Sequence, residues 1–220
     1  MSISANDMSK FFCPGDIYFD IGAHIGDKAI PIIESQIRTI LVEPQPACVE
    51  ILKQRFASRG SMIDIVQAAL GSRPDISKMS INSSSPTIST LSEEWKTGRF
   101  KNETWDSEID VNVLTLDLLI SKYGKPRYMK IDVEGYEFEV LKGLSQKVGI
   151  ISFEFTSEYI KNANLCMKYL NLLGYSRFNV KLGNDEQFVL KDWVDIEALS
   201  IWLSESVNQH DMLWGDIYVN

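Results

Sequence analysis

Short apolar runs alternate with amphipathic segments along the first third of the chain. Runs rich in β-branched and aromatic residues predict strands, and the segments between them carry apolar residues at helical spacing. The predicted strands are residues 16–20, 39–43 and 62–66, and the predicted helices are residues 25–36 and 46–58. Alternation at this spacing is typical of right-handed βαβ units, so we expect an α/β fold with a parallel sheet covered by helices on both faces.

The regular pattern breaks after Gly71 and resumes near Val111. The intervening residues are rich in serine and keep their aromatics, so we interpret residues 72–110 as an insertion of short strands and loop. Thr115 is placed to cap a short helix, with Asp117 in its first turn. The remaining pattern predicts strands at residues 128–131, 148–153, 175–180 and 215–219, a helix that ends at Gly143, a helix at 159–173, and a second insertion at 181–214.

The composition is that of one globular domain. The chain has 220 residues, of which 45% are hydrophobic and 24% charged. Its net charge of −8 argues against a nucleic-acid partner, which would require a basic surface. No apolar run is long enough to span a membrane, and the first residues lack the basic and apolar regions of a signal peptide. Cys13, Cys48 and Cys166 are scattered and lack metal-ligand spacing, so we expect unpaired thiols in a reducing compartment, the cytoplasm.

A glycine-rich turn follows the first predicted strand. The segment runs Asp20-Ile-Gly22-Ala23-His24-Ile-Gly26, and a helix is expected directly after it. Such a corner gathers backbone N–H groups at one point, and glycine permits close approach of a ligand. The spacing differs from Gly-x-Gly-x-x-Gly, which favours the amino-acid end of S-adenosylmethionine over a pyrophosphate. Glu43 ends the second strand, where a carboxylate can bind both ribose hydroxyls; the alternative is a solvated acid at a strand end.

Acidic residues lie at nearly every predicted strand end. Besides Asp20 and Glu43, these are Asp132, Glu134 and Glu154. The carboxyl ends of parallel strands gather ligands, and a sulfonium or an ammonium would relieve the repulsion among such acids. Each of the three later acids is a candidate general base that accepts a hydroxyl proton during methyl transfer. The alternative for Asp132 and Glu134 is that they cap the helix that follows. No histidine neighbours these acids in the sequence, so we expect no required metal.

Several segments together resemble the FkbM family of S-adenosylmethionine-dependent methyltransferases. They are Phe19–Gly26, Val42–Pro44, Ala68–Gly71, Val113–Asp117, Lys130–Gly143 and Trp214–Tyr218, in the family's order. His24 departs from the pattern, because the family usually has asparagine there.

The resemblance implies a single Rossmann-like methyltransferase domain over residues 1–220, with seven strands of which the last is antiparallel. It also implies that Asp20, Gly22 and Gly26 hold the methionine portion, that Glu43 holds the ribose, and that Ala68 and Ala69 border the adenine. Ala23, His24 and Asp132 are further cofactor-binding candidates, and Asp132 is expected next to the methyl donor. The implied reaction is O-methylation of a small molecule or a glycan. The alternatives are a cofactor-binding partner subunit without catalysis and, less favoured, a nicotinamide-dependent oxidoreductase. The aromatics of the two insertions fit either acceptor stacking or a satellite core.

Overall fold

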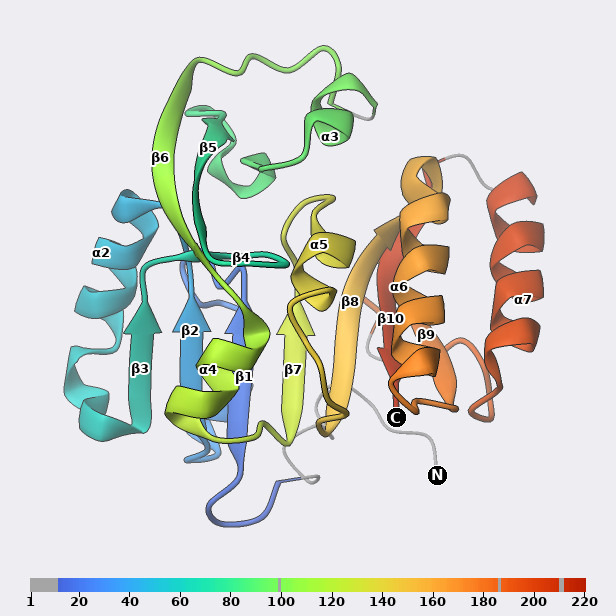
Figure 1. Ribbon diagram of the computed structural model, residues 1–220, viewed down its shortest axis with the longest axis horizontal. Helices are drawn as coiled ribbons and strands as arrows, with labels where there is room; N and C mark the ends of the chain where they lie inside the picture. The colour runs from blue at the N-terminus through green and yellow to red at the C-terminus, as the bar shows by residue number, and fades with distance from the viewer. Residues whose placement is uncertain (1–11, 99, 186, 210–211) are drawn as a thin grey trace.

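The structure is a computed structural model that describes residues 12–98, 100–185, 187–209 and 212–220. A seven-stranded sheet of order β3-β2-β1-β7-β8-β10-β9 forms its centre (Figure 1). Strand β10 is antiparallel to both of its neighbours, β8 and β9. The five strands from β3 to β8 in this order are parallel to one another. The strands are β1 Ile17–Ile21, β2 Arg38–Val42, β3 Ile63–Val66, β7 Tyr128–Ile131, β8 Ile150–Thr156, β9 Phe178–Leu182 and β10 Trp214–Val219. The predicted fold class is therefore confirmed.

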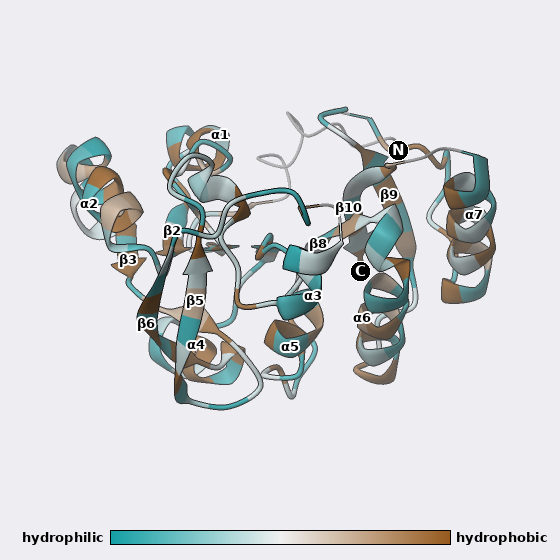
Figure 2. Cartoon of the chain, turned by 90° about the horizontal axis from the view of Figure 1, so that it is seen from above, coloured by the Kyte–Doolittle hydropathy of each residue, from teal (hydrophilic) through white to brown (hydrophobic). Residues whose placement is uncertain are grey.

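Helices cover both faces of the sheet. Seen from above, α4 and α5 lie on one side of the strands and α1 lies on the other (Figure 2). The larger apolar core includes Phe19, Ile40, Met129 and Phe153 of the central strands, all fully buried. The helices are α1 Ile30–Glu34, α2 Pro46–Arg55, α4 Leu116–Tyr123, α5 Glu137–Leu141, α6 Ile160–Leu172 and α7 Ile196–Gln209, with short 3-10 turns at Ala57–Met62 and Ser157–Tyr159.

The helix predicted at residues 25–36 is wrong at its start. Turns occupy the residues after β1, and α1 begins only at Ile30, next to Pro31. Gly22, His24 and Gly26 have φ angles of 84°, 46° and 84°, which a right-handed helix excludes. The glycine turn therefore ends without a helix directly behind it.

The first insertion forms a second, three-stranded sheet of order β4-β6-β5. Its strands rise above the carboxyl ends of the main sheet, and α3 lies beside them (Figure 1). Ala69, Met79, Val111 and Val113 give this sheet a small core of its own. The elements are β4 Ala69–Leu70, β5 Asp75–Ile81, β6 Ser107–Leu114, α3 Glu93–Thr97 and a 3-10 turn at Pro86–Ile88.

The segment predicted as a second insertion contains a helix that the sequence analysis did not predict. Helix α7 contacts α6 and β9, and its Leu199 and Leu203 are fully buried in the main core. Trp202 packs against the same core, and Trp193 packs with Phe188 in a second core cluster. For these two tryptophans, the interpretation as core residues holds.

Two observations bear on the environment of the protein. No helix within the described ranges is both long and apolar enough to cross a membrane. The three cysteines are free: Cys48 and Cys166 are buried, and Cys13 is exposed. Residues 1–11, on which the expectation of no signal peptide rests, lie outside the described residues.

Candidate functional site

One cavity of about 250 Å³ lies where the carboxyl ends of β1, β2 and β7 face the second sheet. Most of the residues predicted from the sequence border it, whereas Gly26 and Glu154 do not. The predicted residues in its lining are Asp20, Gly22, Ala23, His24, Glu43, Ala68, Ala69, Asp132 and Glu134. The sequence therefore located the residues of one cavity although they are spread over more than half of the chain.

The glycine turn shapes one wall of the cavity. A Cβ atom on Gly22 would lie 1.8 Å from the backbone carbonyl oxygen of Asp132, so only glycine allows β1 and β7 to end this close together. His24 has φ 46°, a region that asparagine and histidine tolerate better than most residues. This backbone demand explains how histidine can replace the family's asparagine. Gly26 instead packs against Leu52 and Phe56 of the neighbouring segment, and its proposed contact with a cofactor stays a prediction.

Glu43 holds this turn as well as bordering the cavity. Its Oε2 accepts a hydrogen bond from the His24 backbone N–H, and its Oε1 accepts one from the Gln45 N–H, each at 2.9 Å. The side chain is buried, and burial raises its pKa to about 7 despite these two donors. The interpretation of Glu43 as a solvated strand-end acid is therefore wrong.

Asp20 is the most deeply buried acid of the cavity lining, with 2% of its surface exposed. Burial raises its pKa to about 6, although the positive charge of Lys130 lowers it. Its Oδ2 atom has no hydrogen-bond partner among the described residues. A buried carboxylate oxygen without a donor is rare in folded proteins and calls for a ligand or water that supplies one.

The chain turns sharply after β7, which separates the two acids of the Asp132-Val-Glu134 segment. Glu134 and Gly135 have φ angles of 57° and 86°. Glu137 closes the turn, because its Oε1 accepts hydrogen bonds from the backbone N–H groups of Val133 at 3.2 Å and Gly135 at 3.1 Å. No side chain among the described residues caps the start of α5, so the capping role considered for Asp132 and Glu134 is wrong, and the turn before the helix is instead held by Glu137.

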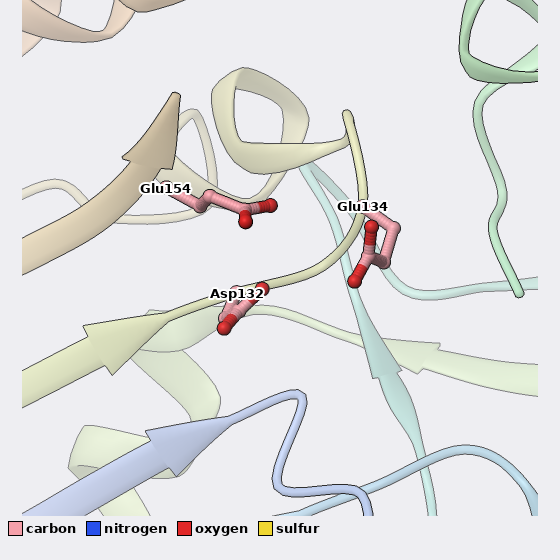
Figure 3. A group of neighbouring side chains, drawn as sticks. All are labelled: Asp132, Glu134 and Glu154. Atoms are coloured by element: carbon pink, nitrogen blue, oxygen red, sulfur yellow. The ribbon is translucent and has the colours of Figure 1, made fainter. Parts of the chain in front are cut away.

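Three carboxylates cluster together, and two of them, Asp132 and Glu134, border the cavity. Asp132, Glu134 and Glu154 come from the end of β7, the turn after it and β8, and each offers an oxygen within 4.8 Å of the others (Figure 3). Burial and the charges of Asp132 and Glu134 raise the pKa of Glu154 well above its usual value. Carboxylates this close can share a proton or a cation. That no metal is required stays a prediction.

Lys130 is the residue of the site that sequence reasoning missed. It is 7% exposed, and its Nζ lies 2.7 Å from Asp132 Oδ2 and 3.5 Å from Asp216 Oδ1. Burial alone would lower its pKa, but the two aspartates raise it well above the usual value. The available signal was a lysine in the middle of the short apolar strand Tyr128–Ile131, where a charge is buried unless it is paired.

The second sheet closes the cavity from above. Met79, Thr87, Ser89 and Leu91 belong to its lining. Hydrogen bonds tie the inserted segment to the main domain: Gln45 Nε2 donates to the Pro86 carbonyl at 3.1 Å, and Thr90 Oγ1 donates to the Glu134 carbonyl at 2.6 Å.

Trp95 of α3 borders a smaller cavity next to the acid cluster. This second cavity also has Glu154 and Thr156 in its lining. Trp95 packs against Tyr159 with ring centroids 5.3 Å apart, and a Cβ atom on Gly135 would lie 2.7 Å from its ring. Of the aromatics in the two insertions, Trp95 is therefore placed beside the candidate acids.

The strand order, with its antiparallel last strand and a ligand-sized cavity at the carboxyl ends, defines a Rossmann-like class I methyltransferase fold. The family model described as the methyltransferase FkbM domain matches residues 20–176. The chain belongs to this family, as the sequence resemblance indicated.

Two curated relatives share sequence with the chain. The hexuronic acid methyltransferase AglP of Haloferax volcanii is 26% identical over 179 residues, which cover 80% of this chain and 70% of that protein. The methyltransferase sdnD of Sordaria araneosa is 27% identical over 155 residues, which cover 58% of this chain and 60% of that protein.

Similar solved structures have low sequence identity to the chain. The precorrin-6y C5,15-methyltransferase of Geobacter metallireducens GS-15 has a TM-score of 0.46 and 13% identity, over 96% of this chain and 84% of that one. The structure of P. horikoshii TYW2 in complex with MeSAdo has a TM-score of 0.48 and 10% identity, over 98% of this chain and 61% of that one.

Proposed function

We propose that the protein transfers a methyl group from S-adenosylmethionine to a hydroxyl oxygen of a small molecule or a glycan. The observation that carries this proposal is the buried Asp20 Oδ2 atom, which borders the main cavity and lacks a donor among the described residues. The α-ammonium group of S-adenosylmethionine is a donor of the right charge for this carboxylate.

The other residues of the cavity suit the rest of the cofactor. Each carboxylate oxygen of Glu43 accepts one backbone hydrogen bond and keeps a lone pair for a ribose hydroxyl. Ala68 and Ala69 are small enough to leave room for the flat adenine ring. When bound, the cofactor supplies an electrophilic methyl group on a positively charged sulfur.

The acids at the rim suit the removal of the acceptor's proton. Asp132 and Glu134 border the cavity, so a carboxylate of either can accept the proton that the hydroxyl loses as its oxygen bonds to the methyl carbon. Glu154 lies outside the lining of the cavity, and burial together with the charges of Asp132 and Glu134 raises its pKa well above its usual value. We therefore favour Asp132 or Glu134 over Glu154 as the base.

The class of acceptor is part of the proposal. The name of the Haloferax relative assigns it a hexuronic acid, which supports a sugar acceptor for this chain as well. The net charge of −8 disfavours a nucleic acid.

The test is a methyl-transfer assay with isotopically labelled S-adenosylmethionine and a panel of methyl glycosides of neutral hexoses and hexuronic acids. Of Asp132→Asn, Glu134→Gln and Glu154→Gln, we expect at least one to lower kcat by about 10²–10⁴-fold, because a general base contributes about that much. Affinity for the cofactor should change much less. Glu205→Gln, which alters an exposed acid on α7, is the matched control and should keep full activity.

Three results would argue against the proposal. Near-wild-type turnover in all three variants would make the acids structural. Binding of the cofactor without transfer to any acceptor of the panel would favour the non-catalytic partner subunit. Reduction of a nicotinamide cofactor would favour the oxidoreductase.

A further inference from the structure

A buried lysine lies among three aspartates beside the cavity. All four residues of β7 are buried, including Lys130, whose Nζ contacts Asp132 at 2.7 Å and Asp216 at 3.5 Å. In the sheet register Lys130 lies directly beside Asp20 on β1. Lys130, Asp20 and Asp132 all border the main cavity, whereas Asp216 is outside its lining. A positive charge is therefore fixed at the point where the acids of the cavity converge.

Asp216 reaches this position because of the C-terminal strand. Strand β10 pairs with β8 and places Asp216 opposite Glu154. Gly215 permits the close approach of β9, since a Cβ atom there would lie 2.0 Å from the Lys181 carbonyl oxygen. The Trp214-Gly-Asp-Ile-Tyr218 motif, for which the proposed reaction has no other use, thus supplies the second anion that holds Lys130.

The lysine lies close to where the methyl donor is expected. The backbone of Gly22 packs directly on the Asp132 carbonyl, so the glycine turn and the Asp132 carboxylate border the same end of the cavity. A ligand whose amino-acid end binds Asp20 has its sulfur near this end. During methyl transfer the sulfur keeps the electron pair of the broken C–S bond and loses its positive charge. Surrounding carboxylates alone would therefore stabilise the charged reactant more than the transition state, which opposes catalysis.

We propose that Lys130, paired with Asp132 and Asp216, offsets the carboxylates at the methyl-donor end of the cavity and so sets the preference of the site for the charged donor over its neutral product, S-adenosylhomocysteine. This proposal rests on the proposed function. Lys130 is a specificity-determining residue of the cavity, and Asp216 is an anion that partly offsets its charge.

The experiment measures the dissociation constants of S-adenosylmethionine and S-adenosylhomocysteine by calorimetry, for the wild type and three variants. The quantity compared is the dissociation constant of S-adenosylhomocysteine divided by that of S-adenosylmethionine. Lys130→Met removes the cation, so this ratio should rise roughly fivefold to thirtyfold, as expected for a unit charge about 8 Å away at an effective dielectric of about 20 to 40. Asp216→Asn removes an anion, and the same ratio should fall by about twofold or more. Lys168→Met removes an exposed lysine of α6 and should leave the ratio unchanged.

The ratio separates an electrostatic role from a structural one. A structural role would weaken both ligands equally, so an unchanged ratio in Lys130→Met and Asp216→Asn, or a shift in the same direction in both, overturns the proposal. If Lys130→Met does not fold, the double variant Lys130→Met/Asp216→Asn takes its place, because it keeps the total charge of the wild type. The ratio for this double variant should exceed the ratio for Asp216→Asn alone. A wild type that binds neither ligand would instead contradict the proposed function.

Discussion

At the scale of single residues, buried acids distinguish this protein. Burial raises the pKa of Asp20 to about 6 and that of Glu43 to about 7, from ordinary values of 3.8 and 4.5. Between about pH 4.5 and pH 7, the folded protein therefore still holds protons on these carboxyl groups, whereas the unfolded chain has already lost them. Over that interval, rising pH lowers the contribution of each such group to the free energy of unfolding, by at most about 1.4 kcal/mol per pH unit.

Glu43→Gln removes the contribution of Glu43 to this pH dependence. We expect the free energy of unfolding of the ligand-free variant, relative to the wild type, to increase as the pH rises from 5 to 8, because only the wild type must ionise the buried carboxyl group at position 43. Urea unfolding at a series of pH values measures this difference. A difference that stays constant or decreases over the same range would show that Glu43 ionises normally in the folded protein.

Residues of the site were predictable from the sequence where an acidic residue directly follows or ends a predicted strand. Asp20 and Glu43 end apolar runs, and the carboxyl ends of neighbouring parallel strands meet. The contact of Lys130 with Asp216 was not predictable in this way, because Asp216 lies 86 positions further on, in the antiparallel strand. A contact of this kind depends on the strand order, which periodicity does not give.

At the scale of elements, turns rather than helix ends build the site. Helix α1 has five residues and begins at Ile30, after the glycine turn. Apolar spacing in residues 25–36 fits a helix, but the left-handed backbone of His24 and Gly26 delays its start. Strands were predicted well, because their β-branched runs are buried on both faces. The second sheet was predicted only as an insertion of short strands and loop, since β4 has two residues and β5 does not alternate regularly between apolar and polar residues.

The turn after β7 should depend on Glu137. Glu137→Ala leaves the backbone N–H groups of Val133 and Gly135 without their acceptor, so we expect a loss of about 2–4 kcal/mol in the free energy of unfolding. Cofactor affinity should fall as well, because this turn carries the cavity residues Val133 and Glu134.

Glu139→Ala is the control for this prediction. It removes a partly exposed ion pair with Lys142, so the free energy of unfolding should fall by less than about 1 kcal/mol. Both unfolding free energies are measured by urea denaturation. Equal losses in the two variants would mean that Glu137 does not hold the turn.

At the scale of the whole molecule, two sheets enclose one ligand-sized cavity. The main sheet supplies the glycine turn and the acids, and the inserted sheet adds Met79 and Leu91 as a cover. The segment matched by the FkbM methyltransferase family, residues 20–176, contains all the residues that line the cavity. The central claim is therefore that this cavity binds S-adenosylmethionine.

Calorimetry on the wild-type protein tests this claim most directly, with S-adenosylmethionine and NAD⁺ titrated separately. We expect saturable binding of one S-adenosylmethionine per chain and no measurable binding of NAD⁺, because the turn lacks the glycine spacing that receives a pyrophosphate. Tighter binding of NAD⁺, or no binding of S-adenosylmethionine, would contradict the assignment of this cavity to the methyl donor.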